Sequence, residues 1–327
     1  MSVVLATAGY DHMIRLWEAP SGKCHAMLKF NDSQVNRLEI SGDKQFLAAA
    51  GNPLIKIFDI TTGEARLTLQ EHTSNVTAVG FSVTGQYLYS ASEDSTLKVW
   101  DLRTTACIQS WPVGSPVNCA TLRSDKDQFW SGDAAGFVKQ WDLRSPSDVV
   151  SSQQPEWEAP SSGSSVGSSS SQGGGRKVNQ NYSISPIQAV DISDDSRTLI
   201  ALSNKGTVFV WDPSITVRYV TQFRSNSIPG TYSLHGKIAP DCRHLVTTAS
   251  DGTAKLWDTA TWELSSTLQA GNKWVWDAAF CADSGYLVTA SSDNTARLFN
   301  LGTARVVQEY YGHQSAVTCV ALNDSSE

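Results

Sequence analysis

Residues 5–17 read LATAGYDHMIRLW, a short apolar run, a turn that carries Asp11, and a second run that ends in Trp17. This phrase recurs along the chain, and each copy closes on an aromatic residue. The further copies are IKIFD, LKVWD, VKQWD, VFVWD, AKLWD and ARLFN, which close at Phe58, Trp100, Trp141, Trp211, Trp257 and Phe299. The chain is therefore built from seven copies of one unit.

The spacing of the closing aromatics identifies the type of repeat. Consecutive copies are separated by 41, 42, 41, 70, 46 and 42 residues. A period of about 40–45 residues with a closing Trp-Asp is typical of WD repeats. The interval of 70 residues contains a Ser- and Gly-rich tract between Ser151 and Gly175, and its removal restores the regular period.

Each unit is predicted to form a small antiparallel sheet. The unit from His72 to Trp100 contains HTSNVTAVGF, QYLYSAS, a turn at residues 93–96, and LKVWD, with apolar and polar residues alternating in the strands. A single four-stranded sheet cannot bury its own faces, whereas sheets stacked radially around a channel bury them against one another. The sequence therefore predicts an all-β fold, a seven-bladed WD-repeat β-propeller.

The two ends of the chain are predicted to complete one blade together. The first unit lacks an opening strand, and the last stretch, GHQSAVTCVAL, has no later strand to pair with. In this stretch His313 is followed by valines at the fourth and seventh positions, as His72 is in the complete internal unit. We therefore expect the N- and C-terminal strands to pair and close the ring, which leaves no long unpaired sheet edge.

Length and composition favour a single domain, residues 1–327, with one insertion. Hydrophobic residues make up 40% of the chain, enough for a core, and every candidate boundary falls inside the repeat lattice. Residues 151–180, rich in Ser, Gly and Gln, cannot bury a core and are predicted to form a disordered insertion between blades four and five. The insertion reads either as a tolerated expansion or as a phosphorylatable or docking segment.

Charge, cysteines and hydropathy exclude several classes of protein. A net charge of −7 without a basic run argues against nucleic acid as the main partner and favours protein partners. The six cysteines are scattered without a CxxC motif, as expected of reduced thiols in the cytoplasm. We expect neither a signal peptide nor direct membrane insertion, because no apolar run approaches the length of about 18 residues that a span needs.

Two units carry the four residue types that form a hydrogen-bonded chain in WD repeats. These tetrads are His72, Ser90, Asp94 and Trp100 in blade three, and Thr7, Asp11, Trp17 and His313 across the two termini. Within the blade-three tetrad, His72, Ser90 and Asp94 also have the residue types of a nucleophilic triad. The same set recurs in a second blade, however, and a catalytic group is not repeated around a ring. We therefore predict a structural role and no enzyme activity, with each buried donor satisfied inside its blade.

The remaining units lack one or more tetrad residues, and no other constellation points to chemistry. Blade five has Ala201 and Lys205 at two of the tetrad positions, so packing alone is expected to hold it. The six histidines and six cysteines never form a metal-ligand pair, and no glycine motif for phosphate binding occurs. Neither a metal nor a cofactor is expected.

Aromatic residues near the predicted turns are candidate binding anchors. They are Tyr10 beside Asp11, Trp130 in the fourth blade, and the pair Trp274 and Trp276, which open the seventh blade. Residues two apart in a strand share one side, so the two indoles are expected to face the same way. A structural role is favoured for Trp276, and an interface role for Tyr10 and Trp274.

Several longer phrases are more specific than the WD pattern. LATAGYDHMIRLW, NDSQVNRLEI, FLAAAGN, SPVNCATL, KWVWDAAFCADSGYLVTASSDNTARLFN and EYYGHQSAVTCVALND resemble the small WD-repeat subunit of the target-of-rapamycin (TOR) kinase complexes, the "lethal with sec-thirteen" family. The resemblance covers nearly the whole chain except residues 151–180, and it is weakest in blade five and at residues 234–237.

The resemblance implies a non-catalytic subunit of both TOR kinase complexes. Such a subunit binds the kinase catalytic domain near its active site, stabilises it, and serves TOR signalling control of growth and the cytoskeleton. It is cytoplasmic, with peripheral association with endomembranes through the complex as a further option. The matching loop segments contain these partner-binding candidates: Tyr10, His12, Asn31, Asp32, Gln34, Asn52, Trp274 and Asp293.

The alternative is a WD-repeat scaffold of another assembly, such as a ubiquitin ligase or a coat, because one propeller fold serves many functions. The sequence also leaves open which face of the ring binds a partner. Capture of the native complex would distinguish a TOR complex subunit from a scaffold of another assembly.

Overall fold

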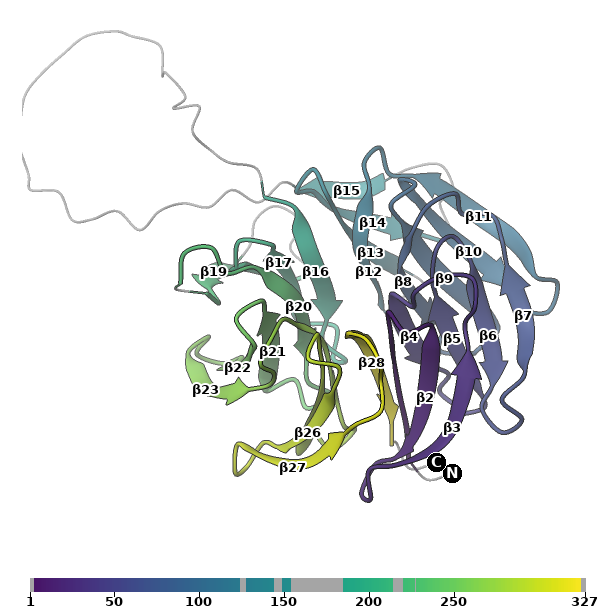
Figure 1. Ribbon diagram of the computed structural model, residues 1–327. Coiled ribbons are helices and arrows are strands. Elements are labelled where there is room, and N and C mark those ends of the chain that lie inside the picture. Colours follow the sequence, from purple (N-terminus) through teal and green to yellow (C-terminus); the bar gives the residue numbers. More distant parts are fainter. Residues whose placement is uncertain are drawn as a thin grey trace, which may run out of the picture.

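The computed structural model describes residues 3–123, 128–143, 149–153, 185–213, 220–226 and 228–324. These residues form seven four-stranded antiparallel sheets, arranged as the blades of a ring, so the predicted seven-bladed β-propeller is confirmed (Figure 1). We call the four strands of each blade innermost, second, third and outer, counted from the central channel. Blade one contains the first strand of the chain, and the others follow in sequence order.

The innermost strands contact one another in a closed circle. From blade one to blade seven they are β28 (Val317–Asn323), β4 (Arg37–Ile40), β8 (Val76–Phe81), β12 (Val117–Arg123), β16 (Ile187–Ile192), β20 (Ser233–Ile238) and β24 (Val275–Phe280). The second strands, in the same order, are β1 (Val4–Gly9), β5 (Phe46–Ala50), β9 (Tyr87–Ser92), β13 (Gln128–Asp133), β17 (Leu199–Ser203), β21 (His244–Ala249) and β25 (Tyr286–Ser291).

The third strands end with the closing aromatic phrases of the sequence. They are β2 (Met13–Glu18), β6 (Ile55–Asp59), β10 (Thr96–Asp101), β14 (Val138–Asp142), β18 (Thr207–Trp211), β22 (Thr253–Asp258) and β26 (Ala296–Asn300). The outer strands are β3 (Lys23–Lys29), β7 (Ala65–Leu69), β11 (Ala106–Pro112), β15 (Val149–Gln153), β19 (Thr221–Arg224), β23 (Leu264–Gln269) and β27 (Arg305–Tyr310).

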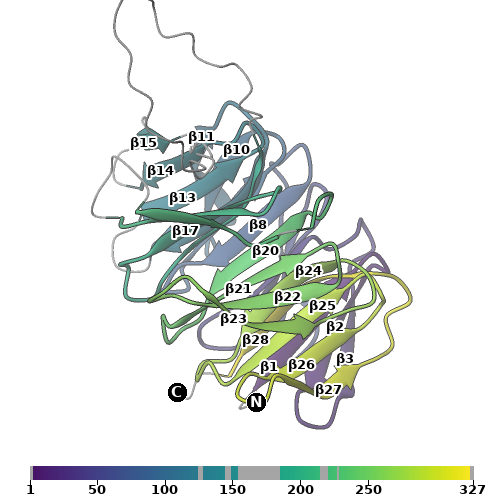
Figure 2. The ribbon, with the colours of Figure 1, turned by 90° about the vertical axis from the view of Figure 1, so that its left-hand side faces the viewer.

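Blade one is assembled from both ends of the chain, as predicted. β28 pairs antiparallel with β1, with Thr7 opposite Val320, and the sheet order is β28-β1-β2-β3. Gly9 allows this approach, because a Cβ atom there would lie 1.9 Å from the carbonyl oxygen of Ala316. The first and last strands consequently lie side by side (Figures 1 and 2). This pairing closes the ring.

The hydrophobic core lies between the blades. Among the described residues, each of seven clusters of buried side chains joins two neighbouring blades. Within β1, Leu5 packs in the cluster shared with blade seven, whereas Ala6 packs in the cluster shared with blade two. Because both faces of a blade are buried in this way, every blade depends on its two neighbours and the core on closure of the ring.

Two predictions about blade four are wrong. Trp130 is buried, with only 4% of its surface exposed, because its face of β13 packs against Ile187 and Val190 of blade five. Residues 151–153 belong to β15, where they pair with β14, so the insertion cannot begin at residue 151. Residues 154–180 lie outside the described residues.

The prediction that packing alone holds blade five is also wrong. The indole Nε1–H of Trp211 donates a hydrogen bond of 2.6 Å to Oε1 of Gln153, the last residue of β15 in blade four. Blade five has Ala201 where a tetrad hydroxyl would stand. A side chain of the neighbouring blade therefore takes the place of the missing acceptor.

Cysteine state and membrane spans can also be checked. All six cysteines are free thiols, as expected. The described residues contain no helix that is long and apolar enough to span a membrane.

Candidate functional site

One side of the ring gathers the partner-binding candidates. Because the strands alternate in direction, the turns between second and third strands open on the same side as the loops that run from each outer strand to the next blade. We call this side the upper face. In blades seven, one and two it carries Tyr10 and His12 (β1–β2 turn), Asn31, Asp32 and Gln34 (β3–β4 loop), Asn52 (β5–β6 turn), Trp274 (β23–β24 loop) and Asp293 (β25–β26 turn).

The β3–β4 loop is fixed by two residues that the sequence reading did not single out. The buried Ser33 hydroxyl accepts a hydrogen bond of 2.8 Å from the N–H of Asn52, which ties the loop to the next turn. The Lys56 ammonium pairs with Asp32 and lies 5.4 Å from the centre of the Phe30 ring. The exposed side chains of this loop are therefore carried by an ordered backbone.

Two exposed aromatic side chains stand on the upper face of blades one and seven. Tyr10 is 48% exposed and Trp274 is 42% exposed. The Trp274 ring packs on Trp276, with ring centres 5.3 Å apart and planes tilted by 52°. Trp276 is anchored in turn, because its Nε1–H donates to Oγ of Ser292 at 2.6 Å. The two indoles thus lie together, with the outer one presented to solvent.

Asp293 is held within the upper face rather than presented on it. Its side chain is 10% exposed. One carboxylate oxygen accepts from Oγ1–H of Thr295 at 2.6 Å, and the other accepts from Arg297 at 2.8 Å and from the N–H of Asn272 at 3.1 Å. Burial would raise the pKa of Asp293, but these donors lower it below its usual value. This geometry suits a residue that holds the loop before Trp274.

The tetrad of blade three is a continuous chain of hydrogen bonds. His72 Nδ1 lies 2.8 Å from Asp94 Oδ2, and His72 Nε2 lies 2.7 Å from Ser90 Oγ. The Trp100 Nε1–H donates to the same hydroxyl oxygen at 2.9 Å. Burial lowers the pKa of His72, which favours the neutral ring with its proton on Nδ1 toward the carboxylate. Thr96 adds a further hydroxyl donor to Asp94 at 2.6 Å.

Blade one repeats this chain with residues from both termini. His313 Nδ1 lies 2.8 Å from Asp11 Oδ2, and His313 Nε2 lies 2.8 Å from Thr7 Oγ1. The Trp17 Nε1–H donates to Thr7 Oγ1 at 2.7 Å. The hydroxyls of Thr7 and Ser90 are both fully buried, so neither can meet a substrate.

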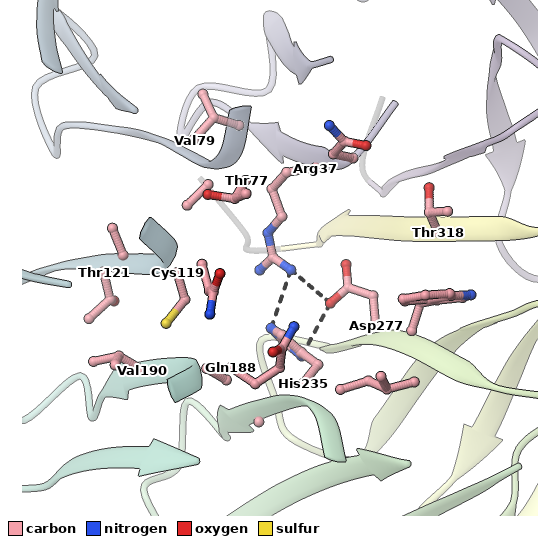
Figure 3. A pocket seen from close by; sticks show the side chains of 18 of the residues that line it. Arg37, Thr77, Val79, Cys119, Thr121, Gln188, Val190, His235, Asp277 and Thr318 are labelled. Carbon is pink, nitrogen blue, oxygen red and sulfur yellow. Dashed lines mark hydrogen bonds and ion pairs between the residues drawn. The ribbon is translucent and has the colours of Figure 1, made fainter. Parts of the chain in front are cut away.

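The central channel holds a charged cluster that the sequence did not reveal (Figure 3). Arg37 points into the channel and donates from Nη1 to Oδ1 of Asp277 at 2.9 Å, with Nε2 of His235 at 3.2 Å from the same nitrogen. The other Asp277 oxygen accepts from the N–H of Val320 at 3.0 Å. Burial lowers the pKa of His235 to about 4, so its ring is neutral at pH 7. The cluster joins blades two, six, seven and one across the channel.

The channel opens on the upper face. Its cavity of about 330 Å³ is lined by all seven innermost strands, and Tyr10, Gln34 and Trp276 stand at its edge. The available sequence signal was the presence of charged or titratable residues inside innermost strands, including Arg37 in β4, His235 in β20 and Asp277 in β24. That signal does not say which of these residues meet across the ring.

A family model matches three segments of the chain, and each segment ends in a blade that keeps the aspartate of the WD-repeat turn. The model described as "WD domain, G-beta repeat" matches residues 63–101, 224–258 and 262–300. These segments end in blades three, six and seven, each of which keeps the turn aspartate, at Asp94, Asp251 and Asp293.

Comparisons over the full length give closer matches. "Target of rapamycin complex subunit wat1" of Schizosaccharomyces pombe is 39% identical over 99% of this chain and 96% of its own length. "Target of rapamycin complex subunit LST8" of Saccharomyces cerevisiae is 36% identical over 99% of this chain and 100% of its own length. The protein of that name from Mus musculus is 33% identical, over 99% and 95% respectively.

Proposed function

The chain belongs to the LST8 family of target of rapamycin (TOR) complex subunits, and we propose that it is a non-catalytic WD-repeat subunit that binds the TOR kinase domain near its active site and stabilises it. The resemblance read from the sequence is thereby confirmed. The proposal extends to this chain the assembly for which its relatives are named. It includes a cytoplasmic location, with peripheral association with endomembranes through the complex.

The observation that carries the proposal is the upper face of blades seven, one and two. Trp274 in the loop into blade seven and Tyr10 in the β1–β2 turn of blade one stand exposed there, and the ordered β3–β4 loop leads from blade one into blade two. Rigid aromatic side chains next to polar groups are typical anchors of protein interfaces, because they bury much area at a small entropic cost. This arc of the upper face is therefore our candidate for the kinase-binding surface.

The tetrads support a non-catalytic role. Each of their hydroxyl oxygens accepts an indole N–H, and each histidine lies between its hydroxyl and its carboxylate inside the blade. A nucleophile needs access to its substrate, and neither Ser90 nor Thr7 has it.

The proposal is tested by capture of the tagged full-length protein from its own cells. We expect a TOR kinase to copurify, and Trp274→Ala to lower the captured kinase roughly tenfold or more, as expected for an anchor worth about 1.4 kcal/mol or more. Tyr286→Ala is the matched control. Tyr286 is also an exposed aromatic residue of blade seven, but it lies at the end of β25 that points away from the upper face. This substitution should leave capture unchanged.

Two outcomes would contradict the proposal. Another stable assembly in place of a TOR kinase would assign the chain to a different scaffold. Equal loss of the kinase with Trp274→Ala and Tyr286→Ala would remove the upper face as the binding surface.

A further inference from the structure

Six of the seven third strands carry a Lys or Arg two residues before the closing aromatic. These cations are Arg15, Lys56, Lys98, Lys139, Lys255 and Arg297. Blade five has Phe209 at this position. We call the six residues the strand cations.

Each strand cation contacts the loop that leads into its own blade. The contacts are Arg15 to the Gly312 carbonyl at 2.7 Å, Lys56 to the Asp32 carboxylate, Lys98 to the Glu71 carboxylate at 3.6 Å, Lys139 to the Val113 carbonyl at 2.6 Å, Lys255 to the Ser225 carbonyl at 2.7 Å, and Arg297 to the Ala270 carbonyl at 2.8 Å. Four of the six bonds go to a backbone carbonyl and therefore do not depend on the loop sequence.

The chemistry of these contacts suits a device that fixes loops. The chain leaves its ladder where an outer strand ends, so the carbonyls there need another donor. A long cationic side chain on a rigid third strand can reach such a carbonyl, and charge-assisted hydrogen bonds are stronger than neutral ones. The loop conformation on the upper face is then determined by a residue inside the sheet.

Blade five is informative because its residue at this position, Phe209, has no side-chain donor. The loop that leads into blade five is the one that contains residues 154–184, and it is the longest between two blades. The other loops that connect an outer strand to the innermost strand of the next blade are short, including the β27–β28 loop that leads into blade one. Each of these loops contacts a strand cation. The cation is thus absent at the one loop whose length departs from the repeat.

We propose that the strand cations are positioning residues of the upper face, which hold its loops in the conformation that the partner binds. This inference rests on the proposed function above. Lys56 holds the loop that carries Asn31 and Asp32. Arg297 binds the Ala270 carbonyl and the Asp293 carboxylate, and so fixes the loop before Trp274.

The global fold is expected to depend little on Lys56. The side chain of Lys56 is 20% exposed, and that of its partner Asp32 is 41% exposed. Ion pairs so close to water contribute little to folding stability. Loss of Lys56 should therefore act on the local order of the β3–β4 loop, which separates positioning from a general structural role.

The experiment uses Lys56→Met in the full-length protein and reads two quantities. The first is hydrogen exchange in the free protein at the amides of Phe30 and Asn52, which bond across the loop to His12 and Ser33. We expect exchange at least about fivefold faster, because local opening becomes easier. The second is TOR kinase capture, which should fall about fivefold while the thermal unfolding midpoint stays within a few degrees.

Three further variants make the test specific. Lys56→Arg keeps the charge and the reach and should restore both quantities. Lys23→Met, at the far end of β3, should change neither. Arg297→Met should increase exchange at residues 270–274 instead, and it keeps the test decisive if Lys56→Met fails to fold.

The outcomes separate this inference from the proposed function. Unchanged exchange in Lys56→Met and Arg297→Met would overturn the clamping role, whatever the capture shows. Faster exchange with undiminished capture would overturn the positioning role and leave the proposed function in place. Failure of the proposed function is seen independently, as the absence of a TOR kinase from the complex of the unmodified protein.

Discussion

Blades one and three carry the same tetrad but assemble it from different parts of the chain. In blade three His72 and Asp94 are 22 residues apart, whereas in blade one Asp11 and His313 are 302 residues apart. The distance between the histidine Nδ1 and the carboxylate is nevertheless 2.8 Å in both blades. The geometry of the tetrad therefore comes from the sheet and its neighbours, and it does not require a continuous chain.

The two tetrads differ in what they stabilise. In blade three the bonds reinforce a sheet whose four strands follow one another in the chain. In blade one they join the two ends of the chain, together with the β28–β1 ladder and the hydrogen bond from the Tyr310 hydroxyl to the Ala19 carbonyl at 2.7 Å. Closing such a long loop costs entropy, so its contacts must outweigh that cost. We therefore expect damage in blade one to spread further than damage in blade three.

The largest effect is expected from deletion of residues 312–327. This removes β28, so β1 loses its inner partner and the buried cluster that contains Leu5, Val317 and Val320 is opened. The expected result is loss of cooperative thermal unfolding and association of the exposed edge. Circular dichroism during heating and gel filtration would measure both.

A circular permutant is the matched control for this deletion. New ends between Thr84 and Gly85, in the turn between β8 and β9, with a short Gly/Ser linker joining the old termini, would make blade three the blade that is assembled from both chain ends. The old ends suit a short linker, because Val4 lies opposite Asn323. We expect the permutant to fold with an unfolding midpoint within several degrees of the parent. Failure to fold would show that continuity of blade three matters more than closure as such.

An intermediate effect is expected from removal of one histidine at a time. His313→Ala and His72→Ala should each cost about 1–3 kcal/mol of unfolding free energy in urea, because each leaves buried hydrogen-bonding groups unpaired. The difference should appear in hydrogen exchange. Faster exchange should extend along β28 in His313→Ala and stay within blade three in His72→Ala. Equally local changes in both variants would contradict the comparison.

The features that the sequence predicted are those that repeat with the period of the blade. The closing aromatics give the number of blades, and the spacing around His72 locates the other members of its tetrad. Closure could be predicted because the valines after His313 repeat those after His72. Each of these inferences compares one copy of the unit with another and needs no knowledge of distant contacts.

The features that the sequence did not predict depend on contacts between blades. Arg37, His235 and Asp277 meet only because the ring brings blades two, six and seven to one channel. Trp130 was misjudged because both faces of a blade are buried, so alternation does not distinguish an inner from an outer side. Residues 151–153 form a strand despite their polar composition, because an outer strand is half exposed and its pattern is weak.

The smallest effect concerns a side-chain donor that blade three has and blade one lacks. Burial alone would raise the pKa of Asp94, but donors including the Thr96 hydroxyl, the Thr73 N–H and His72 lower it below its usual value. In blade one Met13 stands in place of Thr96 and gives Asp11 only a backbone N–H, at 3.2 Å. Thr96→Val should therefore make the donor set of Asp94 resemble that of Asp11, at a cost of about 0.5–1.5 kcal/mol at pH 7.

The pH dependence of this cost tests its cause. A carboxyl group whose pKa is lower in the folded state stabilises the fold above its unfolded pKa of about 3.9, and this contribution is lost as the pH falls through the folded pKa. Loss of Thr96 raises the folded pKa, so the difference between Thr96→Val and the parent should be largest near pH 7 and shrink toward about pH 3. Urea unfolding at several pH values would measure it, with the exposed Thr73→Val as control. A difference that stays constant with pH would mean that Thr96 contributes packing alone, and that blades one and three hold their carboxylates equally well.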